Sequence, residues 1–414
     1  MSLHPQTLDE INFWDLEMFT AGDPHQAWTL LRAEAPVWRH DRPGGEPFWC
    51  VTRYDDARAV LGDAHLFSSE RNGIVLRDDQ VLSAPPLPMS ITPMIHEDPP
   101  RHLPHRKIIR NRFTPPSIAR LEDQLRRYTT SCLDEVAEKR EVDFVSDVAH
   151  RIPAAIALSL MGVPEGDWDR MAELEHITVT GGSDPEFIGD EARTKAVTEA
   201  FTEIFGYFYG LIEQRRQEPA DDLISQLLAG TVDGEPLSVA DVLGDTQLLL
   251  AGGLDTTRAA ASDGGMLALV EHPDQLAALQ EDPSLLATAV DEFVRWASPI
   301  VHEARTVTAP TELQGVRLAE GDRIAVWSPS ANRDERVFDQ PFRYDVRRPG
   351  NRHLGFAYGE HFCLGVHLAR LTLRVEFDEI LRRFGSIELT GEPVRVSSNF
   401  VGGLKHLPVR MTPR

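Results

Sequence analysis

The sequence is poor in cysteine, with only Cys50, Cys132 and Cys363 among its 414 residues. No two of the three are near one another in the chain. This spacing argues against a disulfide framework and against a zinc site built from paired cysteines. A reducing compartment is therefore expected, and the cytoplasm is the simplest one.

Basic residues and long apolar runs are scarce as well. Lys and Arg total 42 against 65 Asp and Glu, a formal net charge of −23. Such a chain is repelled by nucleic acid and by anionic membranes, so neither is an expected partner. No run approaches the ~18 apolar residues of a membrane span. No membrane anchor is therefore expected. The first twenty residues also lack the basic and apolar segments of a signal peptide, so no signal peptide is expected either.

Helical periodicity dominates what is present. The length alone suggests two or three domains, but no linker or low-complexity tract divides the chain. One body over residues 1–414 is therefore expected, with 1–20 as an N-terminal extension. Helices are predicted at 26–36, 116–140, 190–217, 238–270 and 364–384, and short strands at 37–53 and after 298.

The third cysteine lies in FAYGEHFCLG, residues 356–365. A single thiolate can serve as the axial ligand of a haem iron. The helix predicted directly after Cys363 would favour an anionic sulfur at its N-terminal end. Flanking glycines would let a flat cofactor approach the backbone. The alternative for a lone cysteine is a buried structural thiol.

Phe356, Gly359, His361, Cys363 and Gly365 together form Phe-x-x-Gly-x-His-x-Cys-x-Gly. This string resembles the haem-ligand loop of the cytochrome P450 monooxygenases. The resemblance implies a mainly α, single-domain fold with a minor β lobe around a buried haem b. It makes Cys363 the iron ligand and dioxygen a co-substrate, with the ligand loop and its following helix at 349–370. Ala357 departs from the glycine most common there, and its extra methyl is expected to matter little.

The predicted helix at 238–270 contains QLLLAGGLDTTRAA. Gly252 and Gly253 should weaken a helix by about 1 kcal/mol each. They indicate either a helix packed closely on a neighbour or a local opening of the helix. The family's Gly-x-Asp-Thr pattern falls on Gly253, Asp255 and Thr256. By resemblance, Asp255 relays protons, and Thr256 orients water and oxygen for cleavage of the O–O bond.

Glu292 and Arg295 lie three residues apart, on one face of a helix. Most such pairs are solvated ion pairs on the surface. The resemblance instead places this pair inside the protein, joined by a third basic residue, which we assign to Arg348. Its implied role is structural, because it would hold the cysteine loop against the core.

Haem carries two carboxylates, which need cationic or hydrogen-bonding partners when buried. His102 and Arg106 share a helix face in residues 96–113, which resembles the third long helix of the family. With Arg305 and His361, they match the family's ligands for these carboxylates.

A metal cluster of His96, His102 and His105 is the competing interpretation of these histidines. Their sequence neighbours include no suitable set of acids or thiols. His105 is expected to be a surface residue.

The resemblance implies a substrate pocket lined by aliphatic side chains, and hence a lipophilic substrate such as a terpenoid, a sterol-like molecule or a branched fatty acyl chain. Each lining residue could equally be core packing. An apolar loop at 70–98 is expected to form the substrate access. The expected lining is Ile74, Val75, Met89, Ile91, Met94, the stretch 176–186, Leu248, Ala251, Ile300, Val301, Phe400 and Val401.

The sequence has no glycine-rich flavin or nicotinamide fingerprint. Electrons are therefore expected from a separate ferredoxin and its reductase, and the enzyme itself is expected to be a monomer. Two alternatives on the same fold are a peroxide-driven peroxygenase, which would lack the Asp255–Thr256 pair, and a non-catalytic haem-binding protein. A cysteine hydrolase is disfavoured because no orienting acid accompanies Cys363. The expected docking surface for ferredoxin comprises Arg106, Lys107, Arg110, Arg112 and Arg352.

Overall fold

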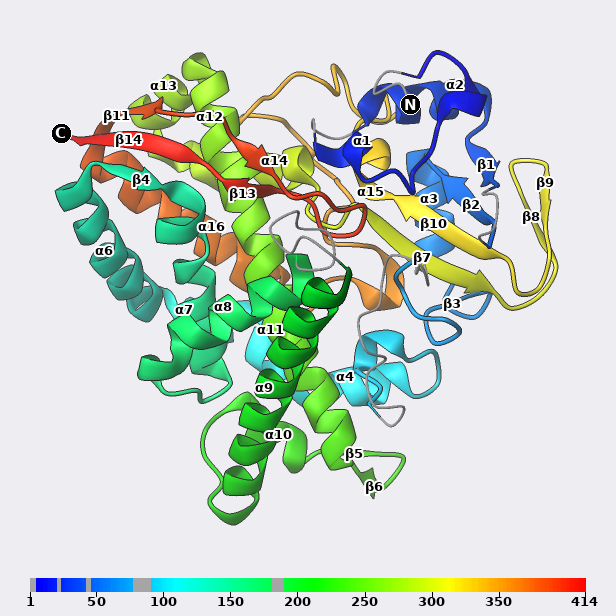
Figure 1. The fold of residues 1–414 in the computed structure, drawn as a ribbon, viewed down its shortest axis with the longest axis horizontal. Coiled ribbons are helices and arrows are strands. Elements are labelled where there is room, and N and C mark those ends of the chain that lie inside the picture. Colours follow the sequence, from blue (N-terminus) through cyan, green and yellow to red (C-terminus); the bar gives the residue numbers. More distant parts are fainter. Residues whose placement is uncertain (1–4, 21–23, 42–45, 77–90, 181–189) are drawn as a thin grey trace.

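The computed structural model describes residues 5–20, 24–41, 46–76, 91–180 and 190–414. Helices make up most of it, and a small β lobe lies at the side where the N-terminal segment packs (Figure 1). The fold is mainly α, as predicted. The α-helices are α1 (Glu17–Thr20), α2 (His25–Glu34), α3 (Tyr54–Gly62), α4 (His102–Arg110), α5 (Pro115–Ala119), α6 (Glu122–Lys139), α7 (Arg151–Leu160), α8 (Trp168–Thr180), α9 (Asp190–Gln217), α10 (Leu223–Leu228), α11 (Val239–Ala259), α12 (Ala268–Glu271), α13 (Pro273–Glu281), α14 (Leu286–Ala297), α15 (Ser328–Ala331) and α16 (Val366–Arg383).

The β lobe is a sheet in the order β1-β2-β10-β7-β3, in which β10 pairs with β2 in parallel and the other pairs are antiparallel. A second sheet in the order β11-β14-β4 lies near the C-terminus, and three two-stranded ribbons complete the strands of the described residues. The strands are β1 (Val37–His40), β2 (Phe48–Val51), β3 (Phe67–Ser68), β4 (Glu141–Asp143), β5 (Thr231–Val232), β6 (Glu235–Pro236), β7 (His302–Val307), β8 (Thr311–Leu313), β9 (Val316–Leu318), β10 (Arg323–Trp327), β11 (Phe384–Leu389), β12 (Val394–Arg395), β13 (Leu404–His406) and β14 (Pro408–Pro413).

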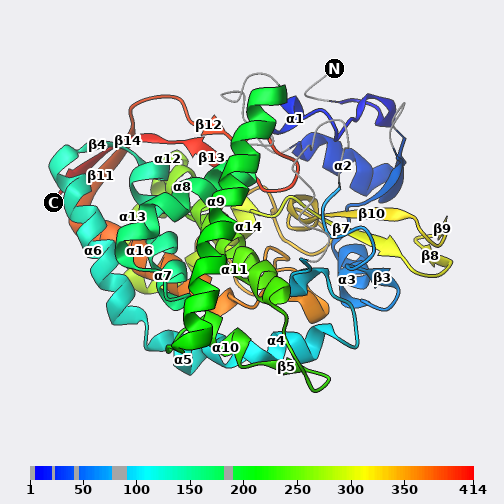
Figure 2. The same cartoon turned by 60° about the horizontal axis from the view of Figure 1, so that its bottom comes forward.

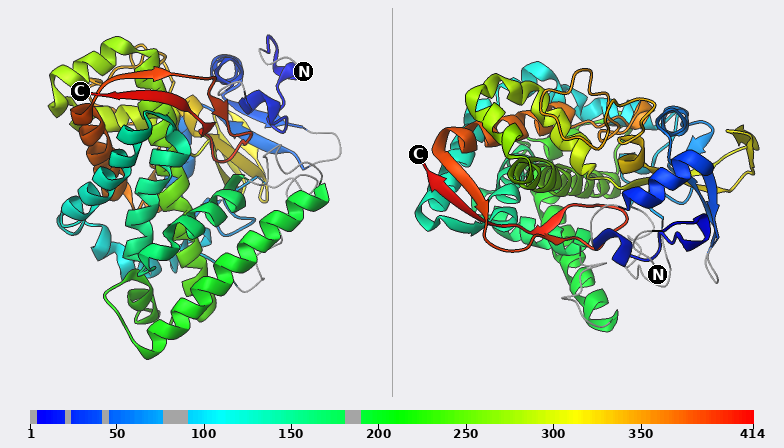
Figure 3. Two further views of the ribbon diagram at one scale, coloured as in Figure 1. Left: turned by 60° about the vertical axis from the view of Figure 1, so that its left-hand side comes forward. Right: turned by 90° about the horizontal axis from the view of Figure 1, so that it is seen from above.

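Helix α11 is the centre of the molecule and packs against α7, α8, α9 and α16. It is seen nearly end-on in the middle of the right-hand view of Figure 3, and α9 crosses in front of it in Figure 2. A capping box between Ser238 and Asp241 starts it, because each residue satisfies a free backbone N–H of the other. The helical run continues as a π-helical segment, Ala260–Leu267, and then as α12.

The N-terminal segment differs from the expected extension, because its apolar side chains complete a core. Phe13 is fully buried, and its ring lies 4.4 Å from that of Trp327 and 6.2 Å from that of Trp28. These rings come from the N-terminal segment, from β10 and from α2. The segment therefore joins the β lobe to the helices.

Two helix predictions differ from the structure in length. The predicted helix at 116–140 is divided into α5 and α6. The segment compared with a third long helix is only nine residues long, α4. None of the described helices combines the length and the apolar character that a membrane crossing requires.

His105 was predicted at the surface, and this was wrong. Its side chain is fully buried between two acids, with Nε2 2.7 Å from Asp245 Oδ2 and Nδ1 3.0 Å from Glu97 Oε2. The periodicity of α4 alone did not reveal these partners, because they lie on α11 and in the segment before α4. No group of three metal-ligating side chains within the described ranges is arranged to hold a metal ion.

The charged His105 cluster should make stability fall in mild alkali. Burial lowers the pKa of His105, but the hydrogen bonds of Asp245 and Glu97 outweigh burial and raise that pKa to about 9. The folded pKa exceeds the unfolded value, so the contribution is complete below about pH 6.5 and lost as pH rises through about 9. We expect a loss of up to about 3 kcal/mol in the free energy of unfolding over this window.

Urea unfolding of wild type and His105→Gln across this window measures the loss. The variant should be less stable near pH 6.5 and should depend little on pH above it. His65→Gln, at an exposed histidine, should keep the wild-type slope. Parallel curves for wild type and His105→Gln would contradict the assignment.

Candidate active site

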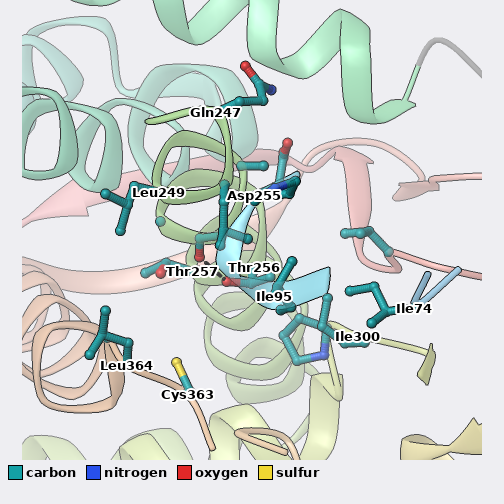
Figure 4. Close-up of a pocket in the computed structure, with 18 of the residues that line it drawn as sticks. Ile74, Ile95, Gln247, Leu249, Asp255, Thr256, Thr257, Ile300, Cys363 and Leu364 are labelled. Atoms are coloured by element: carbon teal, nitrogen blue, oxygen red, sulfur yellow. Dashed lines mark hydrogen bonds between the residues drawn. The ribbon is translucent and has the colours of Figure 1, made fainter. Parts of the chain in front are cut away.

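A cavity of about 610 Å³ lies between α11 and the loop that carries Cys363. Asp255 and Thr256 line it from α11, and Ile74 and Ile300 lie to one side (Figure 4). Most of its lining side chains are apolar. The cavity is large enough for a drug-sized molecule.

Cys363 reaches this cavity from a fixed loop three residues before α16 begins at Val366. Its backbone N–H donates to Phe356 O at 2.9 Å, which closes the loop on itself. Burial raises the pKa of the thiol, while the Gly365 N–H and the Arg106 and Arg370 guanidinium groups act to lower it. The surroundings therefore contain the N–H group and cations that a thiolate needs, should a metal draw off the proton.

Four nitrogen-bearing side chains gather on one wall of the cavity: His102, Arg106, Arg305 and His361. The two imidazole rings stack with their centroids 4.0 Å apart. Burial, followed by Arg106, lowers the pKa of His102 to about 4. Burial, followed by His102, lowers that of His361 to about 2. In the described part of the chain, His102 Nδ1 and His361 Nε2 are buried without hydrogen-bond partners.

Haem fits these features. Its flat apolar ring suits the apolar cavity, its iron suits the Cys363 sulfur, and its two carboxylates suit the unpartnered imidazole nitrogens and the two arginines. A Cβ at Gly365 would stand 3.9 Å from the sulfur, in ordinary van der Waals contact, so this position directly adjoins the sulfur. Phe356 lines the same part of the cavity.

Comparison with known proteins identifies the family to which this sequence belongs. The sequence model of the cytochrome P450 family matches residues 189–408. A methyl-branched lipid omega-hydroxylase of Mycobacterium tuberculosis is 37% identical over 97% of this chain and 94% of its own length. The chain belongs to the cytochrome P450 family.

Two further relatives of this P450 cover nearly its whole length. Linalool 8-monooxygenase of Pseudomonas putida is 33% identical over 96% of this chain and 98% of its own. A solved Mycobacterium marinum cytochrome P450 in complex with pseudoionone has 34% identity and a TM-score of 0.88, and covers 99% of this chain and 100% of that one. The family implies a haem iron, the use of dioxygen, redox partners and a small substrate.

Asp255 is held as a carboxylate on α11 of the P450. Its Oδ1 accepts from Arg258 Nε at 2.7 Å and lies 3.9 Å from His176 Nδ1. Burial would raise the pKa of Asp255, but Arg258 and His176 outweigh burial and hold it well below its usual range. Its Oδ2 is buried with no hydrogen-bond partner among the described residues.

The expected opening of α11 at Gly252 and Gly253 is not found, because α11 is helical throughout Val239–Ala259. A Cβ at Gly253 would lie 3.1 Å from Ala157 Cβ, so this glycine serves close packing on α7. Gly252 borders open space, and its carbonyl accepts from Thr256 Oγ1 at 2.8 Å. Thr256 thus lines the cavity with its hydroxyl bonded to its own helix.

Glu292, Arg295 and Arg348 meet in the interior, close behind the cysteine loop. Arg295 donates two hydrogen bonds, of 2.7 and 2.8 Å, to the Glu292 carboxylate. Arg348 Nε donates a third, of 3.1 Å, to Glu292 Oε2. Arg295 and Glu292 are fully buried. Both arginines also donate to carbonyls of the chain between residues 332 and 343.

Most predicted pocket residues line the cavity, and one does not. Val301 is buried away from it, in the core beside Trp327, because alternate residues of an extended segment face opposite sides. Met89 and part of 176–186 lie outside the described residues. The cavity is lined, as predicted, by Ile74, Val75, Ile91, Met94, Leu248, Ala251, Ile300, Phe400 and Val401.

Sequence reasoning missed several lining residues. Trp14 and Leu16 come from the supposed N-terminal extension. Gln247 lies in the helix predicted at 238–270, and Glu175 lies in α8, which was not among the predicted helices. The polar character of Gln247 beside the apolar run at 248–251 could have signalled it, whereas nothing in the largely polar sequence around Glu175 singles it out.

The extra methyl of Ala357 was expected to matter little, but the backbone conformation of this residue lowers the stability of the fold. Its φ of 58° is in the left-handed region, which a side chain disfavours. Ala357→Gly should therefore raise the free energy of unfolding of the haem-loaded protein by about 1 kcal/mol. Chemical unfolding measures the gain. Ala137→Gly in helix α6 should lower stability by a similar amount, and a loss at both positions would contradict the assigned strain.

Proposed function

We propose that this P450 is a monooxygenase that hydroxylates a C–H bond of a lipophilic small molecule with dioxygen and two electrons from ferredoxin. The carrying observation is the Cys363 sulfur on one side of an apolar cavity and the Asp255–Thr256 pair on another (Figure 4). The names of the relatives, which concern linalool and a methyl-branched lipid, support a terpenoid or branched acyl substrate. The apolar cavity would suit a sterol-like substrate as well.

Haem b, when bound, would supply the activation of dioxygen and the transfer of one oxygen atom. Cys363 would hold its iron, and the carboxylates would bind the four donors of the cavity wall, His102, Arg106, Arg305 and His361. The chain's own apolar lining orients the substrate and excludes water.

Asp255 and Thr256 would manage protons in this site. Because Oδ1 of Asp255 is fixed by Arg258, the free Oδ2 is the atom that takes up a proton. Thr256 Oγ1 can exchange its bond with Gly252 O for a bond to water or oxygen in the cavity. The Glu292 cluster positions the cysteine loop and takes no part in the chemistry.

The docking surface that the sequence predicted for ferredoxin contains fewer basic residues than expected. Arg112 pairs with Asp221, and Arg106 lines the cavity and donates to the Phe362 carbonyl, so neither belongs to the docking surface. Lys107, Arg110 and Arg352 are exposed, and the apolar side chains of Leu103 and Phe362 are exposed as well. An acidic ferredoxin fits this combination of charge and apolar surface.

Lys107→Glu combined with Arg110→Glu tests this docking surface. We expect the KM for ferredoxin at low salt to rise about tenfold, because charge complementarity speeds and steers association. Peroxide-driven turnover should not change. An unchanged KM would mean that ferredoxin docks elsewhere.

One reconstitution tests the proposed function. The haem-loaded protein, reduced under carbon monoxide, should show the red-shifted band of thiolate ligation. It should convert a panel substrate with ferredoxin, reductase and NADPH much faster than with peroxide alone. Absence of the band refutes the haem-thiolate assignment, and faster turnover with peroxide favours a peroxygenase.

The three free thiols support a cytoplasmic location, and sedimentation tests the proposed monomeric state.

A further inference from the structure

The apolar cavity has a polar recess that the proposed chemistry does not use. It is formed by Glu175 of α8 and Gln247 of α11, both of which line the cavity. Gln247 Nε2 donates to Glu175 Oε2 at 2.8 Å. Gln247 precedes Thr256 by nine residues, or about 13 Å along the helix axis. Figure 4 accordingly shows Gln247 and Cys363 at opposite ends of the site.

Both side chains of this recess are left with an unused oxygen. Glu175 is 0% exposed, and neither its Oε1 nor Gln247 Oε1 has a hydrogen-bond partner in the parts of the chain that the structure describes. The nearby Thr178 hydroxyl donates to the backbone carbonyl of Glu175 at 2.8 Å and so leaves Oε1 unused. Buried polar atoms without partners are rare and destabilising. Their presence at the wall of a cavity is explained if the cavity's occupant completes them.

The protonation of Glu175 defines what the recess can bind. Burial first, and the Asp255 carboxylate second, raise the pKa of Glu175 to about 8, so the acid is mostly neutral at pH 7. Because Oε2 already accepts from Gln247, the proton belongs on Oε1, which becomes a donor. Gln247 Oε1 is an acceptor only.

A hydroxyl group is the complement of one donor beside one acceptor. It accepts from Glu175 Oε1 and donates to Gln247 Oε1. A ketone satisfies only the donor, and a hydrocarbon satisfies neither. A carboxylate would face the Gln247 oxygen and the nearby Asp255 charge.

We propose that Glu175 and Gln247 bind a hydroxyl group of the substrate, so that this P450 acts on lipophilic alcohols and oxidises a carbon remote from the hydroxyl. This inference rests on the proposed monooxygenase function and narrows its substrate class.

Spectral titration of the ferric haem-loaded enzyme tests the inference. The probes are dodecanol, dodecane and dodecanoate, and an acyclic terpene alcohol with its parent hydrocarbon. We expect each alcohol to bind with a Kd about tenfold lower than its hydrocarbon. Glu175→Leu and Gln247→Leu should reduce this preference to about twofold or less, while Glu175→Gln, which keeps a donor and an acceptor, should retain most of it.

Thr372→Val is the matched control, because Thr372 lines the cavity from α16. It should leave the preference for alcohols unchanged. If alcohols bind no more tightly than hydrocarbons, or if no alcohol of the panel binds, the inference is wrong. The same holds if the leucine variants keep the full preference.

A second measurement needs no ligand. If the unused oxygens await a substrate, Glu175→Leu should raise the melting temperature of the substrate-free enzyme by about a degree or more. A lower melting temperature would mean that Glu175 is a satisfied structural acid, and would overturn the inference. Tight binding of alcohols without turnover would contradict only the proposed monooxygenase function. Turnover without a preference for alcohols would contradict only the proposed binding of a substrate hydroxyl by Glu175 and Gln247.

Discussion

Asparagine in place of Asp255 should slow product formation about a hundredfold or more, because a positioned acid or base contributes that much to proton transfer. The variant preserves the shape of the side chain and its bond to Arg258, but its amide cannot take up and release a proton at the Oδ2 position. Substrate binding should change little, since the cavity keeps its volume. The measurement is the ferredoxin-driven turnover number, with the ratio of product to NADPH consumed.

The ratio of product formed to NADPH consumed should distinguish a loss of proton delivery from a general loss of protein integrity. With Asp255→Asn, NADPH consumption should become uncoupled from product, and the solvent deuterium isotope effect on turnover should increase. Thr256→Val should also uncouple the two, whereas Thr256→Ser, which keeps the hydroxyl, should stay closer to wild type. Full coupling in Asp255→Asn would show that protons reach the cavity by another route.

Asp263→Asn is the matched control for loss of a buried acid in the same helical run. Asp263 makes two bonds to Arg395, of 2.9 and 3.0 Å, and does not line the cavity. Its replacement should lower stability and leave turnover per folded, haem-loaded molecule unchanged. Equal losses of turnover in the two variants would mean that Asp255 acts only through the helix.

The fold class and the cysteine loop could be predicted because their signals are local. Helical periodicity depends on neighbours three and four residues away, and it placed α9 correctly at 190–217. The cysteine, its glycines and the following helix are likewise contiguous in the chain. Such features survive in a single sequence because no distant contact decides them.

Features decided by distant contacts were not predictable. His105 is buried only because acids from α11 and from the preceding segment surround it. Val301 and Ile300 are neighbours in sequence, yet only Ile300 lines the cavity. The pairing of Glu175 with Gln247 depends on how α8 crosses α11. A helix pattern states which face is apolar, but not which polar residue the neighbouring helix will meet.

Glutamine in place of Glu292 should cost about 3–5 kcal/mol in the free energy of unfolding, the largest stability loss we expect for a single substitution in this P450. The carboxylate is fully buried and accepts bonds from Arg295 and Arg348, from Asn351 Nδ2 at 3.0 Å and from the Asp345 N–H at 2.9 Å. Glutamine would keep some of these bonds but would remove the negative charge of the carboxylate. Among the described contacts of the cluster, this is the only charge that offsets the guanidinium groups of Arg295 and Arg348. Chemical unfolding of the haem-loaded protein measures the loss.

Exposed pairs provide the contrast that identifies burial as the cause. Glu203 makes two bonds to Arg170, of 2.8 and 2.6 Å, but both side chains are about half exposed, at 48% and 50%. Glu203→Gln should therefore lower the free energy of unfolding far less than Glu292→Gln, despite equally good geometry. Because Arg348 and Arg295 hold the chain that leads to the cysteine loop, hydrogen exchange in Glu292→Gln should rise first between residues 332 and 354, with faster loss of haem. Similar losses at both glutamates, or unchanged exchange in that segment, would show that the buried cluster does not secure the loop.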